Sequence, residues 1–259
     1  MSNKEKKRTP SIIHPLGEEP WVTLDNADDM KSWEHADEVE YNQNNRQIEK
    51  YKFFVKTFDM LNDNEIKGGY HEFGCHRART FRMALTEAHR HNMQEMNFFA
   101  YDSFEGLPET STPTKSLWHT PGVLTTTEED FLAHIQKHGI YTDRVRTIKG
   151  FYDDSLTDDL QTSLLDAGEV VALATVDCDL YESAVPVFKF LEPLIQEGTV
   201  IYLDDLFCGY NNIPTKGIGR AFLEFQQYSK FKFLRHMDVG WWGRTYIAYQ
   251  DDGAPEGVL

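Results

Sequence analysis

Apolar residues recur along the chain with two different spacings. Between residues 47 and 62 they return every three or four positions, as they do on the buried face of a helix. From residue 69 onward, short apolar runs alternate with longer amphipathic segments, which is typical of strands that are each followed by a helix. Residues 1–45 are polar and weakly periodic. We therefore expect a polar tail with a lid or interface segment over 1–45, and one α/β domain over 46–259.

The alternating segments predict a doubly wound sheet with helices on both faces. Expected strands are 70–73, 97–101, 144–148, 170–176 and 199–203, and expected helices are 77–92, 128–138, 155–167, 183–196 and 216–228. Strands joined through helices run parallel, with right-handed crossovers. Two last strands, 232–237 and 245–250, have no helix between them, so they predict an antiparallel hairpin that completes a seven-stranded sheet.

The charge balance narrows the class of partner. Lys and Arg total 26 against 42 Asp and Glu, a formal net charge of −16. Such a surface repels phosphate backbones and anionic lipid, so we expect neither a nucleic-acid nor a membrane partner. No apolar run approaches the roughly 20 residues that span a bilayer, and the polar, basic start does not resemble a secretory signal. Cys75, Cys178 and Cys208 have no CxxC spacing and fit packing roles in a reduced cytoplasm.

Candidate chemistry follows the ends of the predicted strands, which is where open α/β sheets bind ligands. Glu72 and Gly74 end the first strand, and a glycine at this turn lets the backbone approach a ligand. The loop is not GxGxxG and no Walker lysine follows, so pyrophosphate binding is disfavoured. Asp102 ends the second strand, where a carboxylate can accept both hydroxyls of a ribose. Gly150 and Phe151 follow the third strand and predict either an adenine slot or core packing.

Four aspartates follow the fourth and fifth strands: Asp177, Asp179, Asp204 and Asp205. Carboxylates that converge in one cleft repel each other unless they share a proton or a cation. A hard divalent cation such as Mg²⁺ would remove this repulsion and could activate a substrate hydroxyl. The alternative is that Asp179 and Asp205 cap the helices that follow them.

Several of these stretches resemble a known family, the macrocin-type sugar O-methyltransferases of antibiotic biosynthesis. The specific blocks are Asp102-Ser103-Phe104-Glu105-Gly106-Leu107-Pro108 and Asp177-Cys178-Asp179-Leu180-Tyr181-Glu182-Ser183, with Glu72-Phe73-Gly74 and Asp204-Asp205 as more common motifs. Together they lie between about Tyr70 and Phe225. The resemblance implies a class I methyltransferase fold, for which a doubly wound sheet ending in an antiparallel hairpin is typical. The sequence differs from the family pattern at Ala78, where a further glycine often completes the first loop.

The resemblance also implies a reaction and its residues. S-adenosyl-L-methionine would be the donor, Mg²⁺ or another hard divalent cation the metal, and a hydroxyl of a sugar or natural product the acceptor. Glu72 and Gly74 would hold the methionine end, with Asp102 and Ser103 at the ribose and Gly150 and Phe151 completing the cofactor site. Asp177, Asp204 and Asp205 would bind the metal, and Asp177 or Asp179 would be the general base.

Other functions stay open at this level. A catechol-like or other small aromatic acceptor is the main alternative, a nicotinamide-dependent oxidoreductase is another, and a non-catalytic scaffold is a third. Residues 109–127 are expected to form a lid over the acceptor, and Trp21, Trp33 and Trp118 either pack structurally or line an aromatic pocket. The polar start and the helix after it suggest a homo-oligomer.

Overall fold

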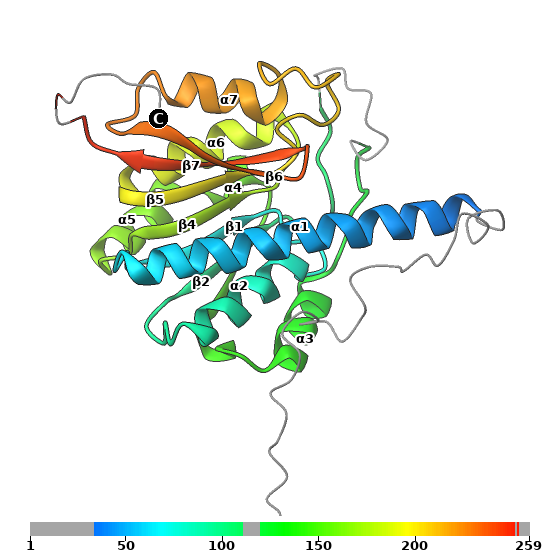
Figure 1. Cartoon of the computed structure of the whole chain (residues 1–259), viewed down its shortest axis with the longest axis horizontal. Helices are drawn as coiled ribbons and strands as arrows, with labels where there is room; N and C mark the ends of the chain where they lie inside the picture. The colour runs from blue at the N-terminus through cyan, green and yellow to red at the C-terminus, as the bar shows by residue number, and fades with distance from the viewer. Residues whose placement is uncertain (1–33, 111–119, 252, 254–259) are drawn as a thin grey trace, which may run out of the picture.

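The computed structural model of the protein describes residues 34–110, 120–251 and 253. Within them, seven strands form one sheet in the order β3-β2-β1-β4-β5-β7-β6. The strands are β1 (Gly69–Phe73), β2 (Phe98–Asp102), β3 (Val145–Lys149), β4 (Val171–Val176), β5 (Ile195–Leu203), β6 (Lys232–Val239) and β7 (Gly243–Tyr249). The first five pair in parallel, whereas β7 runs antiparallel to both β5 and β6. The expected α/β fold, with its antiparallel terminal hairpin, is confirmed (Figure 1).

Helices cover both faces of the sheet (Figure 1). One layer holds α1 (His35–Asp63), α2 (Arg79–Arg90) and α3 (Glu128–His138), and the other holds α4 (Tyr152–Ser155), α5 (Asp158–Asp166), α6 (Tyr181–Leu191) and α7 (Gly217–Phe225). Two short 3₁₀ turns are η2 (Thr142–Arg144) and η3 (Glu192–Leu194). The sheet therefore has a separate hydrophobic core on each face.

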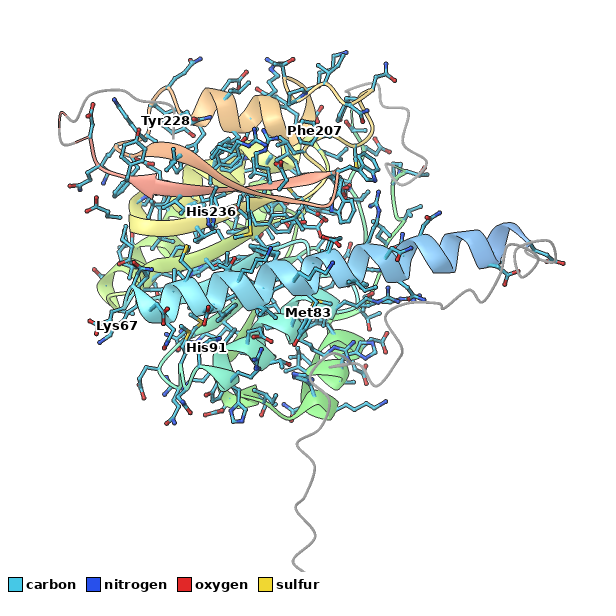
Figure 2. All side chains as sticks on the ribbon, viewed as in Figure 1. Lys67, Met83, His91, Phe207, Tyr228 and His236 are labelled. Atoms are coloured by element: carbon cyan, nitrogen blue, oxygen red, sulfur yellow. The ribbon has the colours of Figure 1, made fainter. Side chains whose placement is uncertain are left out.

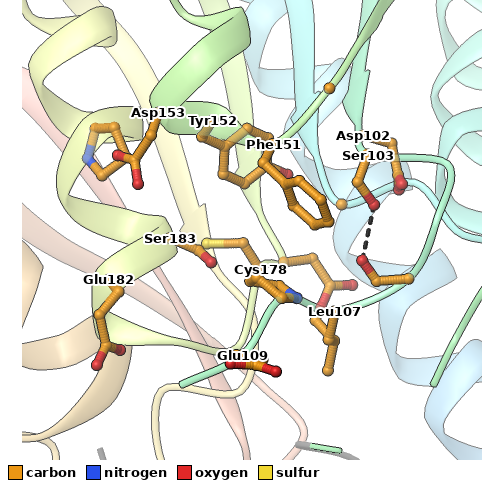
Figure 3. A pocket seen from close by; sticks show the side chains of 16 residues that line it. Asp102, Ser103, Leu107, Glu109, Phe151, Tyr152, Asp153, Cys178, Glu182 and Ser183 are labelled. Atoms are coloured by element: carbon orange, nitrogen blue, oxygen red, sulfur yellow. Dashed lines mark hydrogen bonds between the residues drawn. The ribbon is translucent and has the colours of Figure 1, made fainter. Parts of the chain in front are cut away.

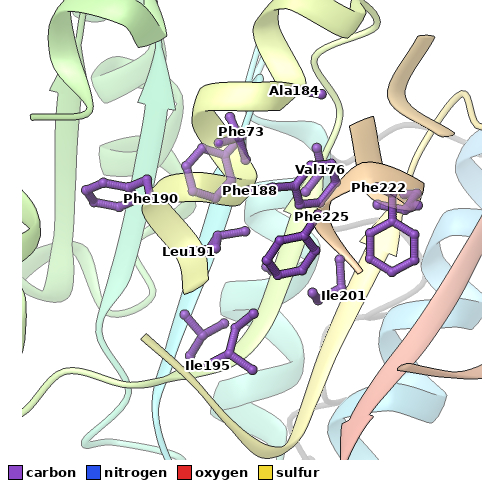
Figure 4. Packing of buried hydrophobic residues seen from close by; sticks show 14 of the residues in the cluster. Phe73, Val176, Ala184, Phe188, Phe190, Leu191, Ile195, Ile201, Phe222 and Phe225 are labelled. Atoms are coloured by element: carbon purple, nitrogen blue, oxygen red, sulfur yellow. The ribbon is translucent and has the colours of Figure 1, made fainter. Parts of the chain in front are cut away.

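The alternation of side chains along the strands produces these two cores. In β2, Phe98 and Ala100 pack with the α1–α3 layer, whereas Phe99 and Tyr101 pack with the opposite layer. Figure 2 shows the side chains of the described residues, among them Met83 of α2, which is buried in the core of the first layer. Figure 4 shows the second core, where the rings of Phe188 and Phe225 stack with centroids 5.2 Å apart. All six residues of β4 are buried, as expected of a central strand covered on both faces.

Some boundaries differ from the predicted ones. α1 begins at His35, twelve positions before the expected start of the helix at residue 47, and it crosses the predicted division between residues 45 and 46. Its first turns have a polar sequence and extend beyond the sheet (Figure 1). The helix expected at 155–167 is instead α4 followed by α5, since the Thr157 side chain caps α5 by accepting from the Leu160 amide. The helix expected to reach residue 196 ends earlier, because Ile195 already pairs with Val171 in the sheet.

The segment around α3 matches its prediction. The helix spans Glu128–His138, the Thr127 side chain accepts from the Asp130 amide at 3.1 Å, and Gly139 ends it with a φ of 73°.

Other predictions fall outside the described residues. They concern Trp21, Trp33, Trp118 and the central part of the expected lid. Among the helices that are described, none combines the length and the apolar character needed to cross a membrane. All three cysteines are free thiols.

Candidate functional site

The carboxyl ends of four neighbouring strands bring the predicted residues together. Tyr101, Phe73, Val176 and Leu203 stand in one registered row across β2, β1, β4 and β5. The residues that follow them in sequence are Asp102, Gly74, Asp177 and Asp204. The chain order reverses between β1 and β4, so this row lies at the switch point where open α/β sheets bind ligands.

No residue with a side chain fits at position 74. Its φ is +93°, and a Cβ at this position would lie 1.9 Å from the carbonyl oxygen of Asp177. The Gly74 amide donates to the Tyr101 carbonyl at 2.9 Å, and the Asp177 amide donates to the Phe73 carbonyl at 2.8 Å. The first loop is therefore held directly against the end of β4.

Asp102 organises the loops on both sides of it. Its Oδ2 accepts from the amides of Cys75 (2.7 Å) and His76 (3.2 Å), and its Oδ1 accepts from the amide of Phe104 at 2.7 Å. The Ser103 hydroxyl donates to the Gly106 carbonyl at 2.7 Å and so closes the next turn. Asp102 and Ser103 thus hold the backbone of the site as well as lining it.

A cavity of about 130 Å³ adjoins this turn (Figure 3). Asp102, Ser103, Gly150 and Phe151 all line it, together with Leu107. Phe151 is 38% exposed, so it does not have the core-packing role that was one of its two predicted roles. The neighbouring Tyr152 packs on Phe73 and donates its hydroxyl to the Tyr101 carbonyl.

A second, larger cavity of about 560 Å³ adjoins the first, and its size suits a small-molecule ligand. The two share Gly74, Asp102, Leu107 and Asp177 as lining residues. Most of the other residues that line the larger cavity have polar or charged side chains. These other lining residues are Gln43, Arg46, Gln47, Lys50, Cys75, His76, Arg77, Arg79, Thr80, Val123, Leu124, Thr125, Asp179, Asp204, Asp205 and Cys208.

Asp177, Asp179, Asp204 and Asp205, named here the carboxylate cluster, all line this larger cavity. Oxygen atoms of Asp177, Asp179 and Asp205 lie within 4.8 Å of one another, an arrangement that a hard cation could bridge. Asp179 and Asp205 both have a positive φ (59° and 51°). The N-cap of α6 is Leu180, and no side-chain cap bond is made there. The N-cap position of α6 is thus occupied by Leu180 and not by Asp179, and Asp205 leads into a turn instead of a helix.

Asp204 differs from the other three carboxylates because donors surround it. Its Oδ1 accepts from the Tyr202 hydroxyl and, at 2.8 Å, from the Trp242 indole N–H. Its Oδ2 accepts from the Lys50 ammonium. Burial alone would raise the pKa of Asp204, but the charge of Lys50 and hydrogen bonds with Asp177, Lys50 and Tyr202 lower it below its usual value.

The other members of the cluster have the opposite shift. Burial and the charge of Asp204 raise the pKa of Asp177 well above its usual range, although Lys50 opposes part of the rise. Burial, with Asp204 and Asp179 close by, raises the pKa of Asp205 to about 8. These shifts are those of carboxylates that would share a proton or a cation.

Glu72 lies beneath the site, in β1. It is fully buried, accepts from the Tyr70 and Thr80 hydroxyls, and lines neither cavity. Ala78, which stands where a glycine was expected, has a φ of 56° and is also fully buried away from both cavities. Its methyl group therefore does not narrow the site.

Sequence reasoning missed the contribution of α1. Lys50 and Arg46 reach the carboxylate cluster from this helix, with Arg46 3.7 Å from Asp205 and 4.9 Å from the ring centroid of Trp242. Lys50 stands four positions before Phe54, in the apolar stripe of the helix. A lysine on a buried helical face is rare unless it is paired, and this was the available signal.

Comparisons with known proteins identify the family of the chain and two of its relatives. Residues 36–238 match the family described as Macrocin-O-methyltransferase (TylF). The chain is 27% identical over 168 residues to the 8-demethyl-8-(2,3-dimethoxy-alpha-L-rhamnosyl)-tetracenomycin-C 4'-O-methyltransferase of Streptomyces olivaceus, covering 62% of this chain and 60% of that protein. It is 24% identical over 148 residues to the demethyldecarbamoylnovobiocin O-methyltransferase of Streptomyces niveus, covering 55% of this chain and 54% of the relative. The similarity thus spans a little over half of each relative.

Solved structures show the same fold. The O-methyltransferase NovP superposes with a TM-score of 0.62 at 18% identity, over 77% of this chain and 79% of the other. The calicheamicin methyltransferase CalS11 superposes with a TM-score of 0.55 at 16% identity, over 83% and 80% of the two chains.

Proposed function

The chain belongs to the macrocin O-methyltransferase family, and from this we propose that it transfers a methyl group from S-adenosyl-L-methionine to a hydroxyl of a sugar or glycosylated natural product. The observation that carries the proposal is the row Asp102, Gly74 and Asp177, which lines two adjoining cavities at the switch point of the sheet.

We propose that the donor lies across this row. Its adenosyl group would occupy the smaller cavity, with the adenine beside Phe151 and the ribose hydroxyls at Asp102. Its methionine end would pass Gly74 into the larger cavity. There Arg77 and Arg79, at the amino-terminal end of α2, supply positive charge for a carboxylate.

The acceptor hydroxyl would then lie at the carboxylate cluster. Asp177 lines both cavities, so it stands closest to the path between donor and acceptor and is our candidate general base, with Asp179 as the alternative. The charged and polar side chains along the larger cavity offer hydrogen-bond partners for the hydroxyls of a sugar. The curated relatives support this choice, since one is named for a rhamnosyl substrate.

The cluster also fits a hard divalent cation. Asp177, Asp179 and Asp205 offer oxygens close enough to hold Mg²⁺, whereas Asp204 has its oxygens taken by Tyr202, Trp242 and Lys50. We therefore propose Asp179 in place of Asp204 as the third ligand. When bound, such an ion lowers the pKa of a hydroxyl that it contacts.

We further propose that the protein forms a homo-oligomer, in which the projecting start of α1 contacts a neighbouring copy (Figure 1). Light scattering after gel filtration tests the oligomeric state.

Calorimetric titration with S-adenosylhomocysteine, in Mg²⁺ and in excess EDTA, tests the donor class. We expect binding in both conditions, and a separate heat for Mg²⁺ that disappears in Asp205→Asn. Asp153→Asn, which removes a carboxylate from the smaller cavity alone, is the matched control and should keep the Mg²⁺ heat. Absence of S-adenosylhomocysteine binding in both conditions would reject the methyltransferase proposal. Transfer of labelled methyl to glycosylated products but not to catechols would then identify the acceptor class.

A further inference from the structure

The hairpin between β6 and β7 turns beside the carboxylate cluster. Leu203 at the end of β5 pairs with Arg244 near the start of β7, so the turn lies at the edge of the sheet where the parallel strands end (Figure 1). Within the turn, two neighbouring tryptophans have opposite surroundings. Trp242 is 4% exposed and donates to Asp204, whereas Trp241 is 60% exposed. A large aromatic side chain is therefore presented at the ligand-binding edge of the sheet.

Two glycines allow the turn to take this conformation. Gly240 has a φ of +58°, and a Cβ at this position would collide with the ring of Trp242. A Cβ on Gly243 would lie 2.8 Å from the ring of Tyr202. The inner side of the turn is thus closely packed, and Trp241 is left on its outer side.

Trp241 lines a third cavity, of about 490 Å³. The other residues that line it are Phe207, Asn212, Asp238, Gly240, Gly243 and Arg244. Phe207 follows Asp205 by two positions, and its amide donates to the carbonyl of Trp242 at 3.1 Å. Arg46, which lines the larger cavity, lies 3.7 Å from Asp205 and 5.6 Å from the ring centroid of Trp241. A single guanidinium therefore connects the carboxylate cluster to the third cavity.

The lining of the third cavity favours an uncharged ring as its ligand. Its two charged side chains are paired with each other, since Nε of Arg244 donates to Oδ1 of Asp238 at 2.6 Å. The same guanidinium lies 5.2 Å from the ring centroid of Phe207. The indole of Trp241 offers an apolar face for stacking, and Asn212 offers an amide for a hydrogen bond. An apolar surface with a few polar groups is typical of a small-molecule site.

We propose that the third cavity is a second subsite for the acceptor, in which Trp241 stacks on an uncharged ring bonded to the sugar that is methylated. This ring would be an aglycone or a second sugar, while the methylated sugar lies at the carboxylate cluster. Arg46 contacts the indole and positions it. The inference rests on the proposed function, and it makes Trp241 a residue that selects glycosides by the group attached to their sugar.

Calorimetric titration with three rhamnosides, in the presence of S-adenosylhomocysteine and Mg²⁺, tests the subsite. Methyl α-L-rhamnoside has no second ring, 4-nitrophenyl α-L-rhamnoside has an aryl aglycone, and a methyl rhamnobioside has a second sugar. The wild type should bind one of the two-ring ligands about tenfold more tightly than methyl rhamnoside, and that ligand identifies the kind of ring. Trp241→Ala should lower this preference roughly threefold to tenfold. Trp241→Phe, which keeps a ring, should retain it within about twofold.

The preference is a ratio of two Kd values, so a general effect of a substitution on the fold cancels. Tyr228→Ala is the matched control, because it removes a ring that is 55% exposed and lines none of the three cavities. It should leave the preference unaltered.

Three results would overturn the inference. The first is a preference that Trp241→Ala leaves unaltered, and the second is a wild type that binds neither two-ring ligand. The third is a change of oligomeric state in Trp241→Ala, measured by light scattering, which would assign the indole to an interface between copies. Titration with S-adenosylhomocysteine alone separates these outcomes from failure of the proposed function, because a protein that binds it but shows no preference lacks only the subsite.

Discussion

Thr80 donates its hydroxyl to Oε1 of Glu72 across 2.7 Å, and this bond connects the larger cavity to a carboxylate that does not line it. Thr80 lines the cavity at the start of α2, while Glu72 lies one layer deeper in β1, where Tyr70 also donates to it. Glu72 therefore acts on the site by holding Thr80, and its ionisation is coupled to the stability of the fold.

Stability of the ligand-free protein should fall with rising pH because of Glu72. Burial raises the pKa of this group from 4.5 to about 8, although the Tyr70 and Thr80 hydroxyls oppose part of the rise. The folded state therefore binds more protons than the unfolded state between these values, so the stabilising contribution, complete below 4.5, is lost as the pH rises through 8. The slope is on the order of 1 kcal/mol per pH unit. Urea unfolding across pH 5–9 measures it, and Glu72→Gln should lower the slope by about 1 kcal/mol per pH unit, leaving the contributions of Asp177 and Asp205, whose pKa values are also raised.

The matched control for this experiment is Glu65→Gln, which alters an exposed glutamate in the turn after α1. It should retain the wild-type slope. A Glu72→Gln variant with an unchanged slope would show that Glu72 does not contribute and that the pH dependence comes from the other buried carboxylates, Asp177 and Asp205.

The sequence was sufficient to predict the residues at the strand ends. Gly74, Asp102 and Asp177 each follow an apolar run, and parallel strands bring their carboxyl ends to one edge whatever the details of packing. The orientation of Glu72 could also have been predicted, because residues two positions apart in a strand, here Tyr70 and Glu72, lie on the same face of the sheet. Partners from distant elements could not be foreseen. Lys50 reaches Asp204 because of the angle at which α1 packs on the sheet, and that angle depends on the whole core.

Asp102→Ala should weaken donor binding in two ways: it removes the proposed contact with the ribose, and it loosens the loops that Asp102 holds. The substitution removes the acceptor for three backbone amides, those of Cys75, His76 and Phe104. Hydrogen bonds to a charged group are worth about 1.5–3 kcal/mol, so we expect the Kd for S-adenosylhomocysteine to rise roughly tenfold to a hundredfold. Calorimetry measures the change. Asp166→Ala, on α5 and outside both cavities, should leave the Kd unaltered, and an unaltered Kd in Asp102→Ala would exclude this carboxylate from the donor site.

Phe151→Ala should affect donor binding without affecting stability. The ring is 38% exposed at the smaller cavity, so its removal leaves no void in the core. Loss of an aromatic contact with adenine costs about 0.5–1.5 kcal/mol, which corresponds to a Kd for S-adenosylhomocysteine roughly twofold to tenfold higher. Calorimetry and a thermal melt of the same sample give both quantities. A lower Tm with an unaltered Kd would assign Phe151 to packing instead.

Asp177→Asn should abolish methyl transfer and spare the donor. Asp177 lines both cavities, and general-base catalysis contributes about a hundredfold to ten-thousandfold, so kcat should fall by at least two orders of magnitude. The Kd for S-adenosylhomocysteine should change little, because the contacts of Asp102 and Phe151 remain. Asp179→Asn, which alters a residue that lines only the larger cavity, should lower kcat less. The two variants are compared by initial rates with labelled donor and by calorimetry. A larger loss in Asp179→Asn would transfer the role of base to Asp179, and full activity in both would remove the carboxylates from the proton transfer.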